Sequence, residues 1–108
     1  MEIRIASDFS KYPGPRNRHE GDHSAQEFLE DILLPRFREA VANKVRLRVV
    51  LDGTSGYATS FLEGSFGELQ RRVKDEGLRI MDVLDMVSDE EPYLLVEIKE
   101  YIEDAMGS

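Results

Sequence analysis

The 108-residue chain contains no cysteine and no tryptophan, and it has no long apolar run. The absence of cysteine excludes disulfides, a thiolate nucleophile and cysteine-ligated zinc or iron–sulfur centres. No segment approaches the roughly 18 apolar residues that a membrane span needs, and Met1–Arg4 does not resemble a secretory signal. The length of 108 residues fits one domain, residues 1–108. The absences predict no membrane span, and we expect the protein in a reducing compartment, the cytoplasm.

Basic side chains are scarce in the second half of the chain. Residues 1–48 hold nine Lys and Arg against eight Asp and Glu, whereas residues 49–108 hold five against fourteen, and the whole chain has a net charge of −8. So acidic a surface repels a phosphate backbone, which binds through Lys and Arg. We therefore expect no nucleic-acid partner. The acidic half fits either simple solubility or a basic protein partner.

Hydrophobic periodicity predicts strands that alternate with helices. The apolar pattern predicts three strands, the last more weakly: residues 1–5, 45–51 and 78–84. Three S-x-x-E capping boxes predict the helix starts: Ser24, Ser60 and Ser88. This order favours an α/β fold, a small layered domain with a mostly parallel sheet of three to four strands and three helices. A fourth strand is expected within residues 8–23, and Pro35 is expected to kink or split the first helix.

Two loops should carry any functional site, because ligands and partners of open parallel sheets meet the loops at the carboxyl ends of the strands. These loops are residues 6–23 and 52–59. In the first, Arg16 and Arg18 could clamp a carboxylate or a phosphate. The second leads into a helix whose first amides favour anions. A phosphate on Thr59 or Ser60 would add about −1.5 to −2 charges there; the alternative is that Ser60 is merely the helix cap.

Other chemistry has little support in the sequence. The segment 19–23 brings two histidines together with Glu20 and Asp22, which are ordinary metal ligands, but Gly21 makes it flexible. We expect a solvated loop there, with no metal and no cofactor. Since G-x-S-x-G and H-E-x-x-H are both absent, we expect no enzyme. The remaining catalytic candidates are a Ser/His pair across the two loops and Asp52 as a carboxylate base.

Two stretches carry a resemblance to one protein family, and the match extends over nearly the whole chain. The first runs from Phe9 through Pro13-Gly14-Pro15-Arg16, Gly21 and Ser24-Ala25-Gln26-Glu27-Phe28 to Leu33-Leu34-Pro35. The second runs from Val49-Val50-Leu51-Asp52-Gly53 to Tyr57-Ala58-Thr59-Ser60-Phe61-Leu62-Glu63-Gly64-Ser65-Phe66-Gly67. Together they resemble the prokaryotic STAS-like domain family, a domain of unknown function similar to domains of sulfate transporters and anti-sigma-factor antagonists. The resemblance implies a non-catalytic α/β interaction module.

In the antagonists, a partner kinase that is also the anti-sigma factor phosphorylates a serine at the start of the helix after this strand. The resemblance places Thr59 and Ser60 there, in Ala58-Thr59-Ser60-Phe61 where antagonists have D-S-S-G. It implies a regulatory protein-interaction module whose partner is a histidine-kinase-like ATPase or anti-sigma factor. The alternative is a sensor of a small anionic ligand or nucleotide, held between the two loops. The candidate binding residues are Arg16, Arg18, Gly21, Asp52, Gly53, Tyr57 and Phe61. The oligomeric state is left open.

Overall fold

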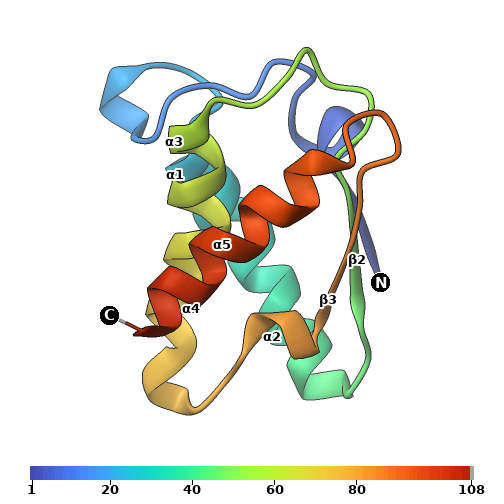
Figure 1. Cartoon of the computed structure of the whole chain (residues 1–108), viewed down its shortest axis with the longest axis vertical. Helices are drawn as coiled ribbons and strands as arrows, with labels where there is room; N and C mark the ends of the chain where they lie inside the picture. Colours follow the sequence, from blue (N-terminus) through green and yellow to red (C-terminus); the bar gives the residue numbers. More distant parts are fainter. Residues whose placement is uncertain (108) are drawn as a thin grey trace.

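Three parallel strands form the sheet of the computed structural model, which describes residues 1–107 (Figure 1). The strands lie in the order β1 (Glu2–Arg4), β2 (Leu47–Val50) and β3 (Leu84–Val87). The helices are α1 (Ala25–Phe28), α2 (Leu34–Asn43), α3 (Thr59–Leu62), α4 (Glu68–Val73) and α5 (Tyr93–Gly107). The predicted α/β class, with parallel strands joined through helices, is therefore confirmed.

Several segments form π-helical or 3-10 turns, some of them between α helices. The π-helical segments are η1 (Ile5–Phe9), η3 (Leu29–Leu33) and η4 (Glu63–Gly67). The 3-10 segments are η2 (Arg18–Glu20), η5 (Lys74–Glu76) and η6 (Ile80–Asp82). The first predicted helix is therefore α1–η3–α2, and the second is α3–η4–α4. Pro35 lies in the first turn of α2, directly after η3, so the predicted interruption takes the form of a π segment.

The helices cover one face of the sheet and leave the other to solvent. Ile3 and Val49 are fully buried beneath the helices, whereas the alternate residues Glu2, Arg4 and Arg48 are exposed. This alternation is typical of a sheet with one packed face. Four phenylalanines fill the centre of the helical layer: Phe28, Phe37, Phe61 and Phe66. In Figure 1 the five α helices accordingly lie to one side of β2 and β3.

The strand predicted at residues 78–84 is wrong for most of that span, because β3 begins only at Leu84. A buried glutamine explains the difference. Gln70 Nε2 donates to the carbonyl of Leu78 (2.9 Å), and the Ile80 N–H donates to Gln70 Oε1 (2.9 Å). Both backbone groups are thus withdrawn from a sheet ladder, and the chain makes the η6 turn before it reaches the sheet.

No strand forms within residues 8–23, so the predicted fourth strand is wrong. The Arg4 N–H, which a further strand could have used, donates to Asp8 Oδ2 (2.7 Å). The chain then turns through η1, and Ser10 N–H donates to the Ile5 carbonyl (2.9 Å). Asp8 therefore ends β1 and covers the outward N–H of its last residue.

One of the three predicted capping boxes lies at a helix start. Ser24 caps α1 and accepts the Glu27 N–H (3.0 Å). The prediction for Ser60 is wrong, because α3 begins at Thr59 and its N-cap is Ala58. The prediction for Ser88 is also wrong: α5 begins at Tyr93, and the Ser88 hydroxyl donates to the Glu91 carbonyl instead (2.7 Å).

Candidate functional site

The loops 6–23 and 52–59 meet at the carboxyl end of the sheet, as predicted. The Ser55 N–H donates to the Lys11 carbonyl (2.8 Å). Gly53 has a φ of +90°, and a Cβ on it would lie 3.2 Å from the Cβ of Ala6. A side chain at residue 53 would therefore be strained and would press on the first loop. Both loops lie at the same end of the molecule (Figure 1).

A third loop, residues 88–92, is tied to the same end by Asp52. This carboxylate accepts the N–H groups of Asp89 (3.1 Å) and Glu90 (2.9 Å). The Gly53 N–H in turn donates to Glu90 Oε1 (2.5 Å). Asp52, a candidate base in the sequence, therefore has its oxygens engaged in joining the loop after β2 to the loop after β3.

Tyr57 and Phe61 anchor the turn between β2 and α3 from inside. The Tyr57 hydroxyl donates to the Leu51 carbonyl (2.7 Å), and burial raises the pKa of Tyr57 to about 12. Phe61 is fully buried, with its ring 5.8 Å from the rings of both Tyr57 and Phe28. These two candidate binding residues position the turn, and the Phe61 ring has no surface for a partner.

Thr59 is presented to solvent by this turn, and Ser60 is half-buried. The side chain of Thr59 lies close to the hydroxyl of Tyr101 on α5. That hydroxyl donates to Glu97 Oε1 (2.7 Å), and this carboxylate is the main reason that the pKa of Tyr101 is raised. Of the two candidate phosphoacceptors, Thr59 is the one that an enzyme or a partner can reach.

Two exposed tyrosines belong to the loops that meet here. Tyr12 is 69% exposed and follows Lys11, whose carbonyl binds the 52–59 loop. Tyr93 is 62% exposed and begins α5 directly after the 88–92 loop. Tyrosine is among the residues that contribute most to protein–protein binding. We call the exposed residues of these three loops, together with Thr59, the α3 surface.

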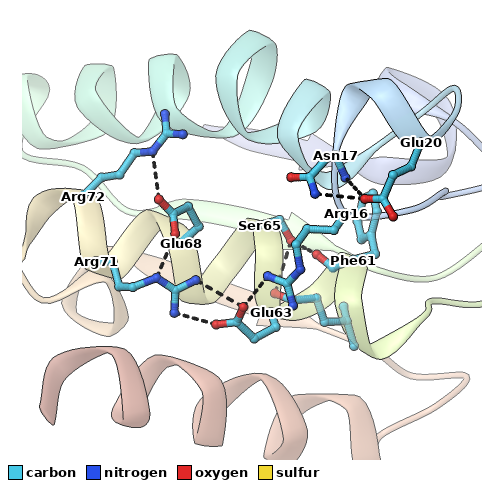
Figure 2. Close-up of polar contacts among 10 residues, drawn as sticks. Arg16, Asn17, Glu20, Phe61, Glu63, Ser65, Glu68, Arg71 and Arg72 are labelled. Carbon is cyan, nitrogen blue, oxygen red and sulfur yellow. Dashed lines mark hydrogen bonds and ion pairs between the residues drawn. The ribbon is translucent and has the colours of Figure 1, made fainter. Parts of the chain in front are cut away.

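Arg16 and Arg18 are held by carboxylates. Arg16 Nη1 donates to Glu63 Oε1 (2.5 Å), and Arg71 Nη1 donates to the other oxygen of Glu63 (2.6 Å), as Figure 2 shows. Arg18 forms ion pairs with Asp31 (2.9 Å) and with Glu30 (3.3 Å). Gly21 is exposed at the end of η2. The structure therefore places Arg16 in a cluster with Glu63 and Arg71, which we call the Glu63 clamp, with Arg18 and Gly21 elsewhere on the first loop. Both guanidiniums are already paired with carboxylates.

The Glu63 clamp was missed in the sequence, where Glu63 was part of a capping box. Two neighbouring glycines give it room. A Cβ on Gly64 would lie 3.0 Å from Arg16 Cγ, and a Cβ on Gly67 would lie 2.7 Å from Glu63 Oε2. The spacing Gly64-Ser65-Phe66-Gly67 inside a predicted helix was the available signal, because glycine in a helix usually marks a close approach.

The Glu63 clamp should make stability depend on acid pH. Hydrogen bonds from Arg71 first, and then from Arg16, lower the pKa of Glu63. The carboxylate therefore stabilises the fold above its unfolded pKa of about 4.3, and this contribution is lost as the pH falls through the lower folded pKa. We expect Glu63→Gln to lower the free energy of unfolding by about 1 kcal/mol at neutral pH.

Urea denaturation from pH 7 to pH 3 measures this effect. The difference in the free energy of unfolding between wild type and Glu63→Gln should shrink below about pH 4. Glu103→Gln is the matched control, since Glu103 is an exposed acid on α5. A deficit that stays constant across the titration, or one equal to that of the control, would contradict the clamp.

His19, His23 and the acids between them do not assemble into a ligand set. Among residues 1–107, no group of three or more histidine, aspartate or glutamate side chains is arranged to hold a metal ion. The His23 ring instead packs edge-on against Phe9, with ring centres 5.9 Å apart. Over the same residues, no helix has both the length and the apolar content needed to cross a membrane. In comparisons with known proteins, no family model, curated protein or solved structure matches the chain.

Proposed function

We propose that the chain is a non-catalytic regulatory module that binds a protein partner through the α3 surface, in the manner of an anti-sigma-factor antagonist. The observation that carries the proposal is the exposed hydroxyl of Thr59 on a turn held by buried contacts of Tyr57 and Phe61. A rigid turn at a surface is suited to recognition, because binding then costs little ordering entropy. The proposed partner, a histidine-kinase-like ATPase or anti-sigma factor in the cytoplasm, rests on the family resemblance.

Phosphorylation of Thr59 would be the switch. It would add about −1.5 to −2 charges at the first residue of α3. The new group would lie near the Tyr101 hydroxyl and the Glu97 carboxylate, which already binds Tyr101. We infer that the phosphate turns outward, away from Glu97, and repels a partner docked on the α3 surface. Ser60 is less suited to this role because it is half-buried.

A sensor of a small anionic ligand has weaker support. Arg16 and Arg18, which would have bound the anion, are engaged by carboxylates. A groove of about 630 Å³ does lie at the carboxyl end of the sheet. Its charged lining is mixed, with three cations and three acids: Arg4, Lys11, Arg48, Asp52, Asp89 and Glu90. Because the acids would repel an anion as much as the cations attract it, we favour the protein-interaction module.

Affinity capture from host lysate with matched baits tests the proposal. Wild type and Thr59→Ala should retain the same specific protein, and Thr59→Glu should retain at least about tenfold less, because a charge buried in an interface without a counter-charge is costly. Asn43→Glu is the control, since it adds the same charge on the exposed end of α2, away from the α3 surface. Equal capture by Thr59→Glu and wild type, or equal loss with Asn43→Glu, would argue against docking at Thr59.

A further inference from the structure

The outer edge of β3 is open. In the parallel ladder, the carbonyls of Val83 and Val87 accept the N–H groups of Leu47 and Leu51 on β2. In a parallel ladder, the backbone N–H and C=O groups of alternate residues point toward opposite edges of the strand. Since Val83 and Val87 face β2, Met86 directs its N–H and C=O away from β2. Since β3 is last in the strand order, no other strand in the described chain covers them.

The opposite edge of the sheet has its outward N–H at Arg4 covered, unlike the edge at Met86. On β1 the outward N–H of Arg4 is taken by Asp8 (2.7 Å). On the outer side of β3, the Leu84 carbonyl is the only group that another described residue covers, through Arg46 Nη2 (2.8 Å). The free N–H and C=O groups of an unpaired strand edge can pair with another chain, and proteins normally cover or disrupt such edges. Met86 is the position at which β3 keeps that capacity.

An apolar groove of about 320 Å³ runs beside this edge. Its apolar lining comes from β3, from the η6 turn and from α5: Met81, Leu84, Met86, Leu95 and Val96. Val96 is 63% exposed and Met81 is 37% exposed. Exposed apolar side chains gathered along a groove are a feature of interaction sites, whereas single exposed ones are ordinary.

Two cations give the groove a charge unlike that of the rest of the chain. Arg46 and Lys99 line it together with Asp85, and within residues 1–107 neither cation forms an ion pair. The chain as a whole has a net charge of −8. A second copy would bring two more cations to the same edge and would be repelled by the overall charge. A short peptide with one acidic residue would instead bring a carboxylate to these two cations and add little charge of its own.

We propose that this edge binds an extended peptide as a fourth strand, with the backbone of the peptide on Met86, apolar side chains in the groove and an acidic residue against Arg46 and Lys99. Strand addition combines main-chain hydrogen bonds for affinity with side-chain pockets for specificity. At 100° per residue, Val96 and Lys99 lie on the side of α5 away from Tyr101 and hence from Thr59. The edge is therefore a second docking surface, separate from the α3 surface.

Selection from a phage-displayed library of random peptides tests the proposal. The peptides enriched on the wild-type chain should alternate apolar residues with a period of two and carry at least one acidic residue. Two variants should weaken a synthesised binder at least about tenfold: Met86→Pro, which removes the outward N–H and is tolerated on an edge strand, and Lys99→Glu, which reverses one cation. Val96→Asp should also weaken the binder. Because Val96 is exposed and the variant introduces no proline, this result would hold even if Met86→Pro failed to fold.

Hydrogen exchange separates strand addition from other modes of binding. The amide of Met86 should exchange at least about tenfold more slowly in the peptide complex than in the free chain, because a new strand hydrogen-bonds it. Failure to enrich any peptide on the wild type, or a bound complex in which Met86 is unprotected, would overturn the proposal. A dimer of the free chain in light scattering with Met86 already protected would overturn it as well, in favour of a second copy as the occupant.

Discussion

Phe61→Ala will lower the free energy of unfolding by about 3–5 kcal/mol, the usual cost of removing a buried phenylalanine ring. Phe61 is fully buried, and its ring lies 5.8 Å from the rings of Phe28 and Tyr57 and 6.2 Å from that of Phe9. The substitution opens a cavity where α3 meets the first loop. Guanidinium denaturation followed by circular dichroism measures the loss.

Phe61→Leu separates this core role from a binding role. Leucine retains most of the buried apolar surface, so we expect less than half of the alanine loss in stability and unchanged capture of a partner. A Phe61→Leu chain that stays folded but no longer captures the partner would show that the ring itself takes part in binding, contrary to its burial.

Gln70→Leu is the second substitution with a large expected effect, about 2–5 kcal/mol of lost stability. The side chain is 1% exposed and serves two backbone groups, the Leu78 carbonyl and the Ile80 N–H. Leucine fills similar space but leaves both groups without a partner, and each unsatisfied buried polar group costs about 1–3 kcal/mol. Urea denaturation measures the change, and a loss below about 1 kcal/mol would mean that the two groups find other partners.

Gln70→Glu is a second variant at this position, and its stability should depend on pH. An ionised glutamate still accepts the Ile80 N–H but cannot donate to the Leu78 carbonyl, whereas a protonated one can do both. Its burial disfavours the charged form, so the folded pKa lies above the unfolded value. We expect Gln70→Glu to be destabilised at neutral pH and to recover relative to wild type as the pH falls through that raised folded pKa.

The parallel α/β frame could be predicted because it depends on local patterns. The strands around Ile3 and Val49 follow from apolar alternation and continuity, and the start of α1 follows from the serine at residue 24. The meeting of the two loops followed from the parallel order alone. The limits of β1 and β3 could not be predicted, since they depend on Asp8 and Gln70 binding backbone groups that a strand would have used.

The candidate site was less predictable, because long-range charge pairing determines which side chains are available. Nothing in the sequence near Arg16 indicates that it binds Glu63, which lies 47 residues further along the chain. Asp52 could equally have been a base, but it holds the loop after β3. Thr59 was found as a candidate from its place after a buried strand, and the structure adds that it is exposed while Ser60 is half-buried.

The claim that matters most is that Thr59 carries the switch, and phosphosite mapping on the chain isolated from its host tests it most directly. Tandem mass spectrometry should find a phosphate on Thr59 in part of the population, and the chain that remains bound to the captured partner should lack it. Phosphate confined to Ser60 or Ser55, or a partner-bound fraction phosphorylated on Thr59 as often as the free fraction, would contradict the account.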